Sequence, residues 1–332
     1  MLRLFPALLL IVLLHTGACA ADDLIATPLT LHEQIKTGAS HAGVRLLGTL
    51  RLNHATINGQ TLCGLSGLAW DESAGLLYAL SDRGVLFHLR PGFDADGMLD
   101  SLQAVAAYPL RDEVDKPLRP PLNDSEALGL ERRDGQPATL LVSFEIRPRV
   151  VRYDRSGHWL GEQDLPMALR DLRQYRDANQ ALEALAIDPR WGFITGTEAP
   201  RRDDPPGQVR IFTRDGLSWR YPLGSAPNSA LVDMVVLDDG RLLTLERAFT
   251  APLRPLIISL RRSPLPAPST AGTPLTPQDV AVFDSSQGWL LDNFEGLSHY
   301  REQRFFMVSD DNCNSWQNTL LVQFELLPAA PR

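Results

Sequence analysis

A pattern of two short strands recurs five times along this chain. Each copy begins with an apolar run that starts on an acidic residue or a serine, turns through Gly, Pro, Asp or Arg, and returns as a second apolar run ending on an acid. Such turns between strand-like runs are typical of β-hairpins. The copies span residues 66–82, 126–145, 183–198, 233–246 and 295–310.

Two more strand-like runs follow each of the first four hairpins, whereas only residues 318–326 follow the fifth. The run at 43–53 can supply the missing strand. Four strands per unit, repeated radially and closed by lending the first strand to the last unit, predict an all-β propeller. The hairpins start 50 to 62 residues apart, which favours five blades. A six-bladed alternative needs one more unit. We expect residues 43–332 to form one domain behind an N-terminal extension at 21–42.

The first twenty residues are typical of a secretory signal peptide: Arg3 precedes the apolar run 8–14, and Ala18-Cys19-Ala20 resembles a cleavage site. We therefore expect a periplasmic or secreted protein. A lipoprotein anchored through Cys19 is the alternative, but Thr16 stands where a large aliphatic residue is usual. No later run reaches the roughly 18 apolar residues of a membrane helix, so no membrane span is expected.

Charge and cysteine content narrow the partners. Cleavage after residue 20 leaves 31 basic against 40 acidic residues, which argues against nucleic acid binding. Cys63 and Cys313 remain, and in an oxidising compartment they predict one disulfide. Cys63 precedes the first inner strand and Cys313 follows the last hairpin, so a bond would lock the seam between the first and last blades.

Aligned repeats place acidic residues in two rings. The inner-strand starts are Ser66, Glu126, Glu183, Asp233 and Glu295, and the second-strand ends are Asp82, Glu145, Glu198, Glu246 and Asp310. Because antiparallel neighbours reverse direction, both positions lie at the same rim of the channel. Nine carboxylates are therefore expected to converge there.

Clustered carboxylates removed from bulk water take up protons or bind cations. Ca²⁺ fits best because it accepts six to eight oxygen ligands in flexible geometry. A transition metal is disfavoured, since no HxH, HExxH or paired-cysteine motif is present. The alternative for any single acid is a salt bridge or a turn cap.

Arginines follow the second-strand acids, among them Arg83, Arg147 and Arg247. Cation sites beside guanidinium groups suit a phosphate ester, whose oxygens can contact both metal and arginine. The alternative is that these arginines neutralise the acids in structural salt bridges.

Several of these segments resemble a known family. SGLAWD (66–71), NDSEALGL (123–130), NFEGLSHY (293–300) and SDDNCNSWQNTLLVQFEL (309–326) are similar to the bacterial phytase-like family described as having esterase-like activity of phytase. The resemblance covers roughly residues 60–327. It implies an exported propeller that hydrolyses phosphoesters or carboxylic esters. Calcium-dependent propeller phytases are similar in that acidic residues hold Ca²⁺ and basic residues hold phosphate. This chain has only two lysines, Lys36 and Lys116, which argues against phytate itself as the substrate.

The leading hypothesis is an exported, metal-dependent hydrolase of small anionic esters, acting as a monomer. Glu183 and Glu295 would be catalytic, Arg83, Arg147 and Arg247 would hold the substrate, and the nine acids would bind Ca²⁺. One alternative is a non-catalytic propeller that binds a ligand or protein around a structural ion. Another is a lactonase-type propeller enzyme with a single divalent metal, which typically has fewer acids in the channel.

Overall fold

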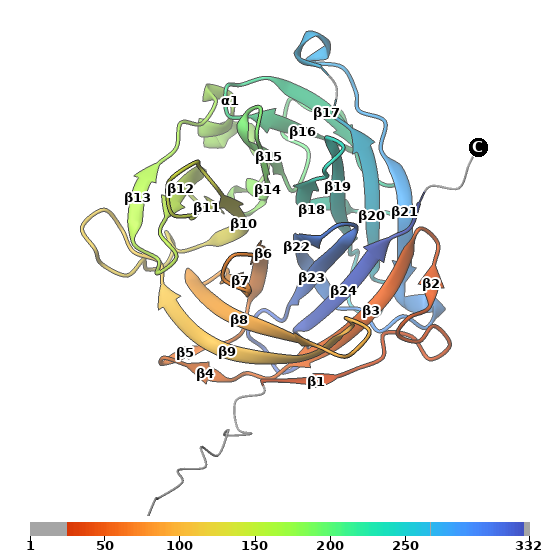
Figure 1. Ribbon diagram of the computed structural model, residues 1–332. Coiled ribbons are helices and arrows are strands. Elements are labelled where there is room, and N and C mark those ends of the chain that lie inside the picture. The colour runs from red at the N-terminus through yellow and green to blue at the C-terminus, as the bar shows by residue number, and fades with distance from the viewer. Residues whose placement is uncertain (1–24, 266, 329–332) are drawn as a thin grey trace, which may run out of the picture.

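The computed structural model describes residues 25–265 and 267–328; the expected signal peptide and Cys19 lie outside them. Five antiparallel sheets surround a central channel, so the chain is a five-bladed β-propeller and the six-bladed alternative is wrong (Figure 1). Blades one to four each contain four strands in sequence order.

The strand bounds of the first four blades follow the repeat. Blade one holds β6 (Leu65–Asp71), β7 (Leu76–Ser81), β8 (Val85–Phe93) and β9 (Leu99–Pro109). Blade two holds β10 (Ser125–Glu131), β11 (Thr139–Phe144), β12 (Arg149–Tyr153) and β13 (Trp159–Glu162). Blade three holds β14 (Leu182–Asp188), β15 (Gly192–Thr197), β16 (Gln208–Thr213) and β17 (Ser218–Pro222). Blade four holds β18 (Ser229–Val236), β19 (Arg241–Ala248), β20 (Ile257–Pro264) and β21 (Gln278–Asp284).

Blade five closes the ring with the N-terminal strand, as the sequence predicts. It runs from β22 (Asn293–Arg301) through β23 (Arg304–Asp310) and β24 (Leu320–Leu326) to β3 (Val44–Leu52). Leu321 pairs with Leu50 in the closing ladder. The short strands β1 (Ala26–Pro28) and β2 (Ser40–His41) pair with β3, and β4 (Thr56–Ile57) pairs with β5 (Gln60–Thr61).

The predicted disulfide joins the two ends of the ring. Cys63, just before β6, is bonded to Cys313, in the loop after β23, across 250 residues of sequence. It therefore fastens blade one to blade five beside the loop 53–64, through which the chain passes from β3 to β6.

Apolar side chains pack between adjacent blades. Between blades one and two, Leu80 and Leu86 contribute to the same buried cluster as Val142, Phe144 and Tyr153. Alternating residues of each strand point to opposite faces, so every blade offers one apolar face to each neighbour. Burying such side chains contributes about 25 cal/mol per Å² of apolar surface, which holds the ring together without a central core.

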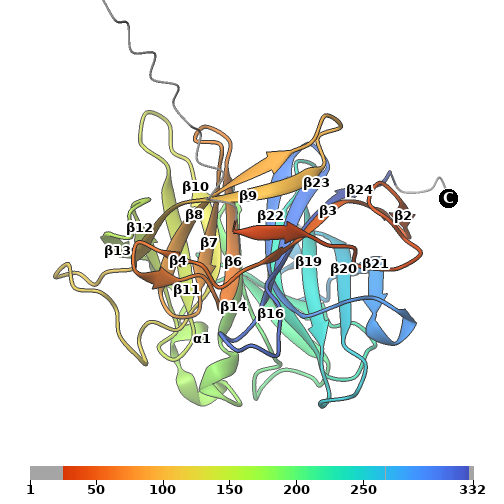
Figure 2. The ribbon, with the colours of Figure 1, turned by 90° about the horizontal axis from the view of Figure 1, so that it is seen from below.

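Helical segments are few and short in the described part of the chain. The helix α1 (Met167–Arg170) and the 3₁₀ turns Leu172–Gln174, Ala178–Gln180, Pro268–Thr270 and Ser285–Gln287 lie in loops. None of the described helices is long and apolar enough to cross a membrane. Figure 2 places α1 at the edge of the propeller opposite the turn between β8 and β9.

Candidate metal and substrate site

Seven of the nine predicted carboxylates meet in one pocket at one end of the channel, which we call the acidic mouth. Its volume is about 160 Å³. Asp124, Asn179, Arg247 and Asn312 complete the lining. The seven predicted residues that lie there are Asp82, Glu126, Glu145, Glu183, Glu198, Glu295 and Asp310.

A β-bulge near the start of each inner strand positions the first ring of acids. The register shifts around Glu126 in β10, around Glu183 in β14 and around Glu295 in β22. A bulge adds one residue to a strand and re-aims its side chain, so these glutamates turn toward the channel. Ser66 occupies the bulge of β6, where it donates a hydrogen bond to the Ser125 carbonyl.

Beyond each bulge, every second side chain of an inner strand faces the channel, because strand side chains alternate between faces. On β10 this set is Glu126, Leu128, Leu130 and Arg132; Glu126 lines the acidic mouth and the other three line a cavity at the far end. Glu183 and Glu295 head similar sets, which continue as Leu185 and Leu297. In blades two, three and five the channel-facing side of the inner strand therefore runs from a glutamate at the acidic mouth to leucine side chains.

Blade four departs from the expected alignment by one residue. The bulge of β18 lies at Val232, not Asp233, and Met234 and Val236 continue the channel-facing set. A slip of one residue turns a strand side chain to the other face. The expected convergence of Asp233 at the mouth is therefore wrong: its buried carboxylate accepts hydrogen bonds from Leu297 N at 2.7 Å and Met234 N at 2.8 Å.

The same slip removes Glu246 from the mouth. Leu231, the residue before the bulge, pairs with Glu246, so the position that holds an acid in the other blades falls on Arg247. Glu246 is fully buried between blades three and four, where Tyr221 Oη of β17 lies 2.6 Å and Arg261 Nη1 of β20 lies 2.8 Å from its Oε1. Its Oε2 accepts from Gly224 N and Ser229 Oγ, both at 2.7 Å. Every carboxylate oxygen is thus occupied by protein donors.

Of the three predicted substrate arginines, one lies in the mouth. Arg247 Nη2 donates to Glu198 Oε1 at 2.7 Å, and Arg247 Nη1 donates to Glu295 Oε1 at 2.6 Å. Arg83 is exposed next to Asp82 and its positive charge opposes the rise in the pKa of that acid. Arg147 lies apart: it pairs with Glu162 on β13, the outer strand of blade two.

Burial raises the pKa of the carboxyl groups in the mouth, and neighbouring acids raise it further. The pKa of Glu145 rises to about 8, first through burial and then through Glu198. Burial and then Glu295 raise the pKa of Asp310 to about 8. Glu126 and Glu183 have pKa values well above the ordinary range for the same reasons. Without a cation, several of these groups therefore hold protons near neutral pH.

Burial also raises the pKa of Glu295, to about 7, although Arg247 opposes the rise. The guanidinium is affected in return. Burial alone would lower the pKa of Arg247, yet Glu295 and Glu198 lift it above its ordinary value. Arg247 therefore stays charged and compensates part of the negative charge of the mouth.

Three carboxylates stand close enough to share a cation. Oxygens of Asp124, Glu126 and Glu145 all lie within 4.8 Å of one another. Among the residues that the structure describes, no hydrogen-bond donor contacts the carboxylates of Asp124 or Glu126, whereas the carboxyl groups of Glu183 and Glu145 are hydrogen-bonded to each other. An all-oxygen set is what Ca²⁺ prefers, so these residues fit that ion.

Asp124 is the acid that the repeat alignment missed. It lies in the loop before β10, two residues ahead of the repeat position. The sequence offered one signal, since Asp124 belongs to the NDSEALGL segment on which the resemblance rests.

Comparison with known proteins agrees with this picture. The family model for phytase-like proteins, described as esterase-like activity of phytase, matches residues 60–313. The chain belongs to the phytase-like family. The match includes the whole acidic mouth of this phytase-like chain, from Asp82 to Asn312. A search of curated proteins finds no match to the sequence.

Solved structures that are similar to this phytase-like protein have low sequence identity to it. The β-propeller domain of Cps50 (Swd1) from Myceliophteria thermophila is 13% identical, with a TM-score of 0.36 and coverage of 86% of this chain and 92% of that one. A gluconolactonase from Xanthomonas campestris is 14% identical, with a TM-score of 0.39 and coverage of 92% and 97%. A Dyadobacter fermentans protein of unknown function is 11% identical, with a TM-score of 0.40 and coverage of 86% and 99%.

Proposed function

We propose that this phytase-like protein is an exported, calcium-dependent hydrolase of small phosphoesters, acting as a monomer. One observation carries the proposal: eight carboxylates line a single mouth of the channel, and oxygens of three of them, Asp124, Glu126 and Glu145, lie within 4.8 Å of one another. Such a concentration of buried negative charge is costly unless cations compensate it. The disulfide between Cys63 and Cys313 supports export, because such bonds persist in oxidising compartments.

Asp124, Glu126 and Glu145 would hold a first Ca²⁺, and Glu183 with Asp82 and Asp310 would provide ligands for further binding in the same mouth. Bound Ca²⁺ would supply positive charge to a phosphoryl oxygen and make a coordinated water more acidic. Arg83, exposed at the rim, would contact the anionic substrate from outside.

The two glutamates expected to be catalytic differ in their surroundings. Glu295 is tied to Arg247 and to Asn293 Nδ2, which lies 2.8 Å away, so its role is to hold the geometry of the mouth. Glu183 has no arginine or amide partner among the described residues and is hydrogen-bonded to Glu145; its pKa is raised well above the ordinary value, first by burial and then by Glu126. A carboxylate so placed suits a general base that takes a proton from the attacking water.

The proposal is tested on the purified mature protein. Turnover of p-nitrophenyl phosphate and of short-chain p-nitrophenyl acyl esters is measured with Ca²⁺ and with EDTA. We expect turnover of the phosphate ester that EDTA abolishes, a loss of about a hundredfold or more in Glu183→Gln, and no change in Glu162→Gln, which alters an exposed acid on β13. Undiminished turnover in EDTA, or in Glu183→Gln, would refute the assignment.

A non-catalytic propeller that binds a ligand around a structural ion is the second candidate. The double salt bridge of Arg247 favours it, because a guanidinium committed to Glu198 and Glu295 braces three blades and is not free to hold a substrate. In that case Ca²⁺ raises the melting temperature but no ester is hydrolysed. Adding a sugar lactone to the same screen tests the lactonase alternative.

A further inference from the structure

The end of the channel opposite the acidic mouth holds a second cavity, of about 280 Å³, which we call the apolar mouth. All five inner strands contribute to it, and it shares no lining residue with the acidic mouth. Its volume is near the lower limit for small-molecule sites in proteins. Nothing in the proposed hydrolase chemistry uses this cavity.

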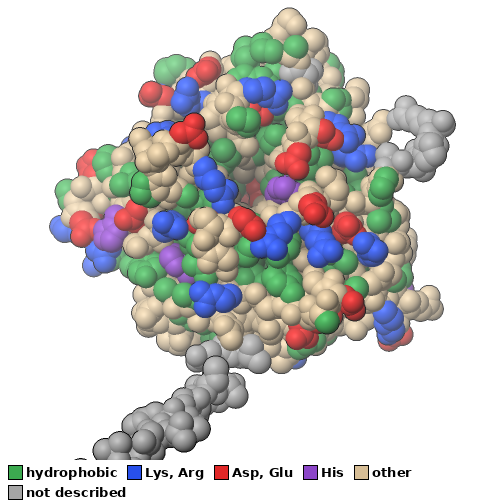
Figure 3. Space-filling model, in the orientation of Figure 1, with side chains coloured by type: hydrophobic (Ala, Val, Ile, Leu, Met, Phe, Trp, Pro, Cys, Tyr) green, Lys and Arg blue, Asp and Glu red, His purple; other side chains and the backbone are tan. Residues whose placement is uncertain are grey.

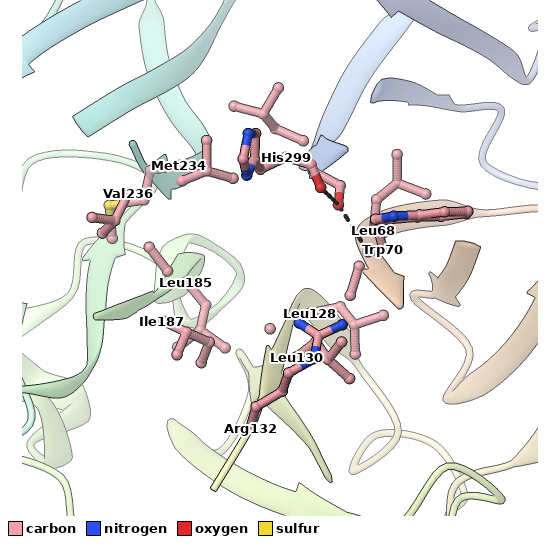
Figure 4. Close-up of a pocket in the computed structure, with 16 residues that line it drawn as sticks. Leu68, Trp70, Leu128, Leu130, Arg132, Leu185, Ile187, Met234, Val236 and His299 are labelled. Atoms are coloured by element: carbon pink, nitrogen blue, oxygen red, sulfur yellow. Dashed lines mark hydrogen bonds between the residues drawn. The ribbon is translucent and has the colours of Figure 1, made fainter. Parts of the chain in front are cut away.

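The floor and wall of the apolar mouth come from the alternation described above. Leu128, Leu185, Met234 and Leu297 form a buried floor, one from each of four blades. Farther out the next channel-facing side chains, including Ile187 and Val236, form a partly exposed wall. Figure 4 shows these side chains arranged in a ring around open space.

The polar groups of this cavity are cationic or neutral. Its described lining contains no carboxylate, and Arg132 reaches from the end of β10 toward the centre of the ring (Figure 4). On the corresponding face, basic and acidic side chains are interspersed around the channel (Figure 3). The cavity thus combines an apolar floor with one guanidinium at its entrance.

Arg132 shares its acidic partners with other arginines. Its Nη2 lies 3.1 Å from Asp71 Oδ1, but Arg155 Nη1 also pairs with Asp71, 3.3 Å from Oδ2. Although burial opposes it, Ser73 and Arg132 lower the pKa of Asp71, so this acid is ionised. Glu72 also interacts with Arg132 but pairs with Arg301. Two carboxylates therefore face three guanidinium groups, and one net positive charge remains beside the cavity.

We propose that the apolar mouth binds a small amphipathic carboxylate, with its hydrocarbon part on the leucine floor and its carboxylate at Arg132. An apolar surface with one cation at its edge selects such a molecule: a neutral alcohol lacks the charge-assisted hydrogen bond to the guanidinium, and a short acid lacks the buried hydrocarbon. The site is independent of Ca²⁺ and of ester hydrolysis at the other end.

Isothermal titration calorimetry of the mature protein with sodium octanoate tests the proposal, with 1-octanol and sodium acetate as ligand controls. We expect octanoate to bind at least tenfold more tightly than either control. Arg132→Gln should weaken octanoate binding at least tenfold. The matched control is Arg190→Gln, which alters a guanidinium at the corresponding turn of blade three that pairs with Asp188 and does not line the cavity.

A second variant blocks the cavity without touching charge. Val236→Phe places a larger side chain on the partly exposed wall, and it should reduce octanoate binding at least tenfold while leaving Ca²⁺ binding unchanged. Any one of three results would overturn the proposal. Octanoate and octanol could bind equally tightly, Arg132→Gln and Arg190→Gln could weaken octanoate binding equally, or Val236→Phe could bind octanoate as the wild type does. Thermal unfolding of every variant confirms that the propeller is intact.

Discussion

Arg247 Nη1 donates a hydrogen bond to Glu295 Oε1 at 2.6 Å, across the boundary between blades four and five. Arg247 occupies the position that holds an acid in each of the other blades, because the bulge of β18 comes one residue earlier than the repeat suggests. Blade four thus contributes the positive charge of the acidic mouth. This exchange of an acid for a guanidinium is what lets so many carboxylates share one pocket.

Removing this guanidinium should destabilise the metal-free protein. Arg247→Met leaves Glu198 and Glu295 without their buried partner, and losing one member of such a group costs roughly 3 kcal/mol or more. Urea unfolding in EDTA measures the loss, and Arg147→Met, which breaks a surface pair, should cost under about 1 kcal/mol. Similar costs for the two variants would contradict the role given to Arg247.

The pH dependence of stability should change sign with calcium. In the fold, the pKa of Glu295 is raised to about 7 and those of Glu145 and Asp310 to about 8. A raised carboxyl pKa stabilises the fold at low pH, and that contribution is lost as the pH rises through the folded value. In EDTA the melting temperature should therefore fall by several degrees between pH 5 and pH 9.

Calcium should reverse that trend, because the cation favours the ionised carboxylates. Melting temperatures measured by circular dichroism at several pH values, with EDTA and with Ca²⁺, check both pH trends. A melting temperature in EDTA that rises with pH would show that these acids are ionised and compensated without a metal.

Variants of Glu183 and Glu246 should affect different properties of the protein, Ca²⁺ binding in one case and stability in the other. Glu183→Gln should weaken Ca²⁺ binding about tenfold or more and leave stability in EDTA nearly unchanged. Burial and then Glu126 raise the pKa of Glu183, so without a cation its carboxyl group is neutral and the amide resembles it. Glu246→Gln should lower stability in EDTA and leave Ca²⁺ binding unchanged, since Glu246 is bonded to Tyr221 of blade three and Arg261 of blade four. Calorimetric Ca²⁺ titration and urea unfolding of both variants give the answer; weaker Ca²⁺ binding in a folded Glu246→Gln would contradict it.

Asp124 should matter as much as the acids of the repeat. Its oxygens lie within 4.8 Å of those of Glu126 and Glu145, so Asp124→Asn should lower Ca²⁺ affinity to about the same extent as Glu126→Gln, roughly tenfold. Asp134→Asn, in the exposed turn between β10 and β11, is the matched control. Unchanged affinity in Asp124→Asn would place the ion elsewhere in the mouth.

The disulfide should stabilise the closed ring. Cys63 and Cys313 are separated by 250 residues, so their bond restricts the unfolded chain strongly. Replacing both by serine should lower the free energy of unfolding by about 3–5 kcal/mol. Urea unfolding of the double variant, compared with the oxidised wild type, measures the change; a loss under about 1 kcal/mol would show that the strand β3 alone secures the closure.

The sequence predicts the fold of this protein more completely than it predicts the site. The hairpins of the repeat, the strand at 43–53 and the pair Cys63 and Cys313 are visible as local patterns, and each appears in the structure where the pattern places it. Seven of the nine expected acids share one mouth, because in four blades the second-strand acid directly follows the residue that pairs with the one before the bulge. Asp233 and Glu246 do not, because β18 bulges one residue earlier.

The sequence by itself determined the number of blades, the order of strands and the general position of an acidic ring, because hydrophobic alternation and turn residues are local properties that recur in every repeat. Only the tertiary structure decided which side chains face the channel. Two alternating sets of β18 side chains could face the channel: residues 232, 234 and 236, or residues 233, 235 and 237. Pairing with β19 and contact with the neighbouring blades select the first set. A one-residue difference there exchanges an acid for Arg247, and no local pattern records it.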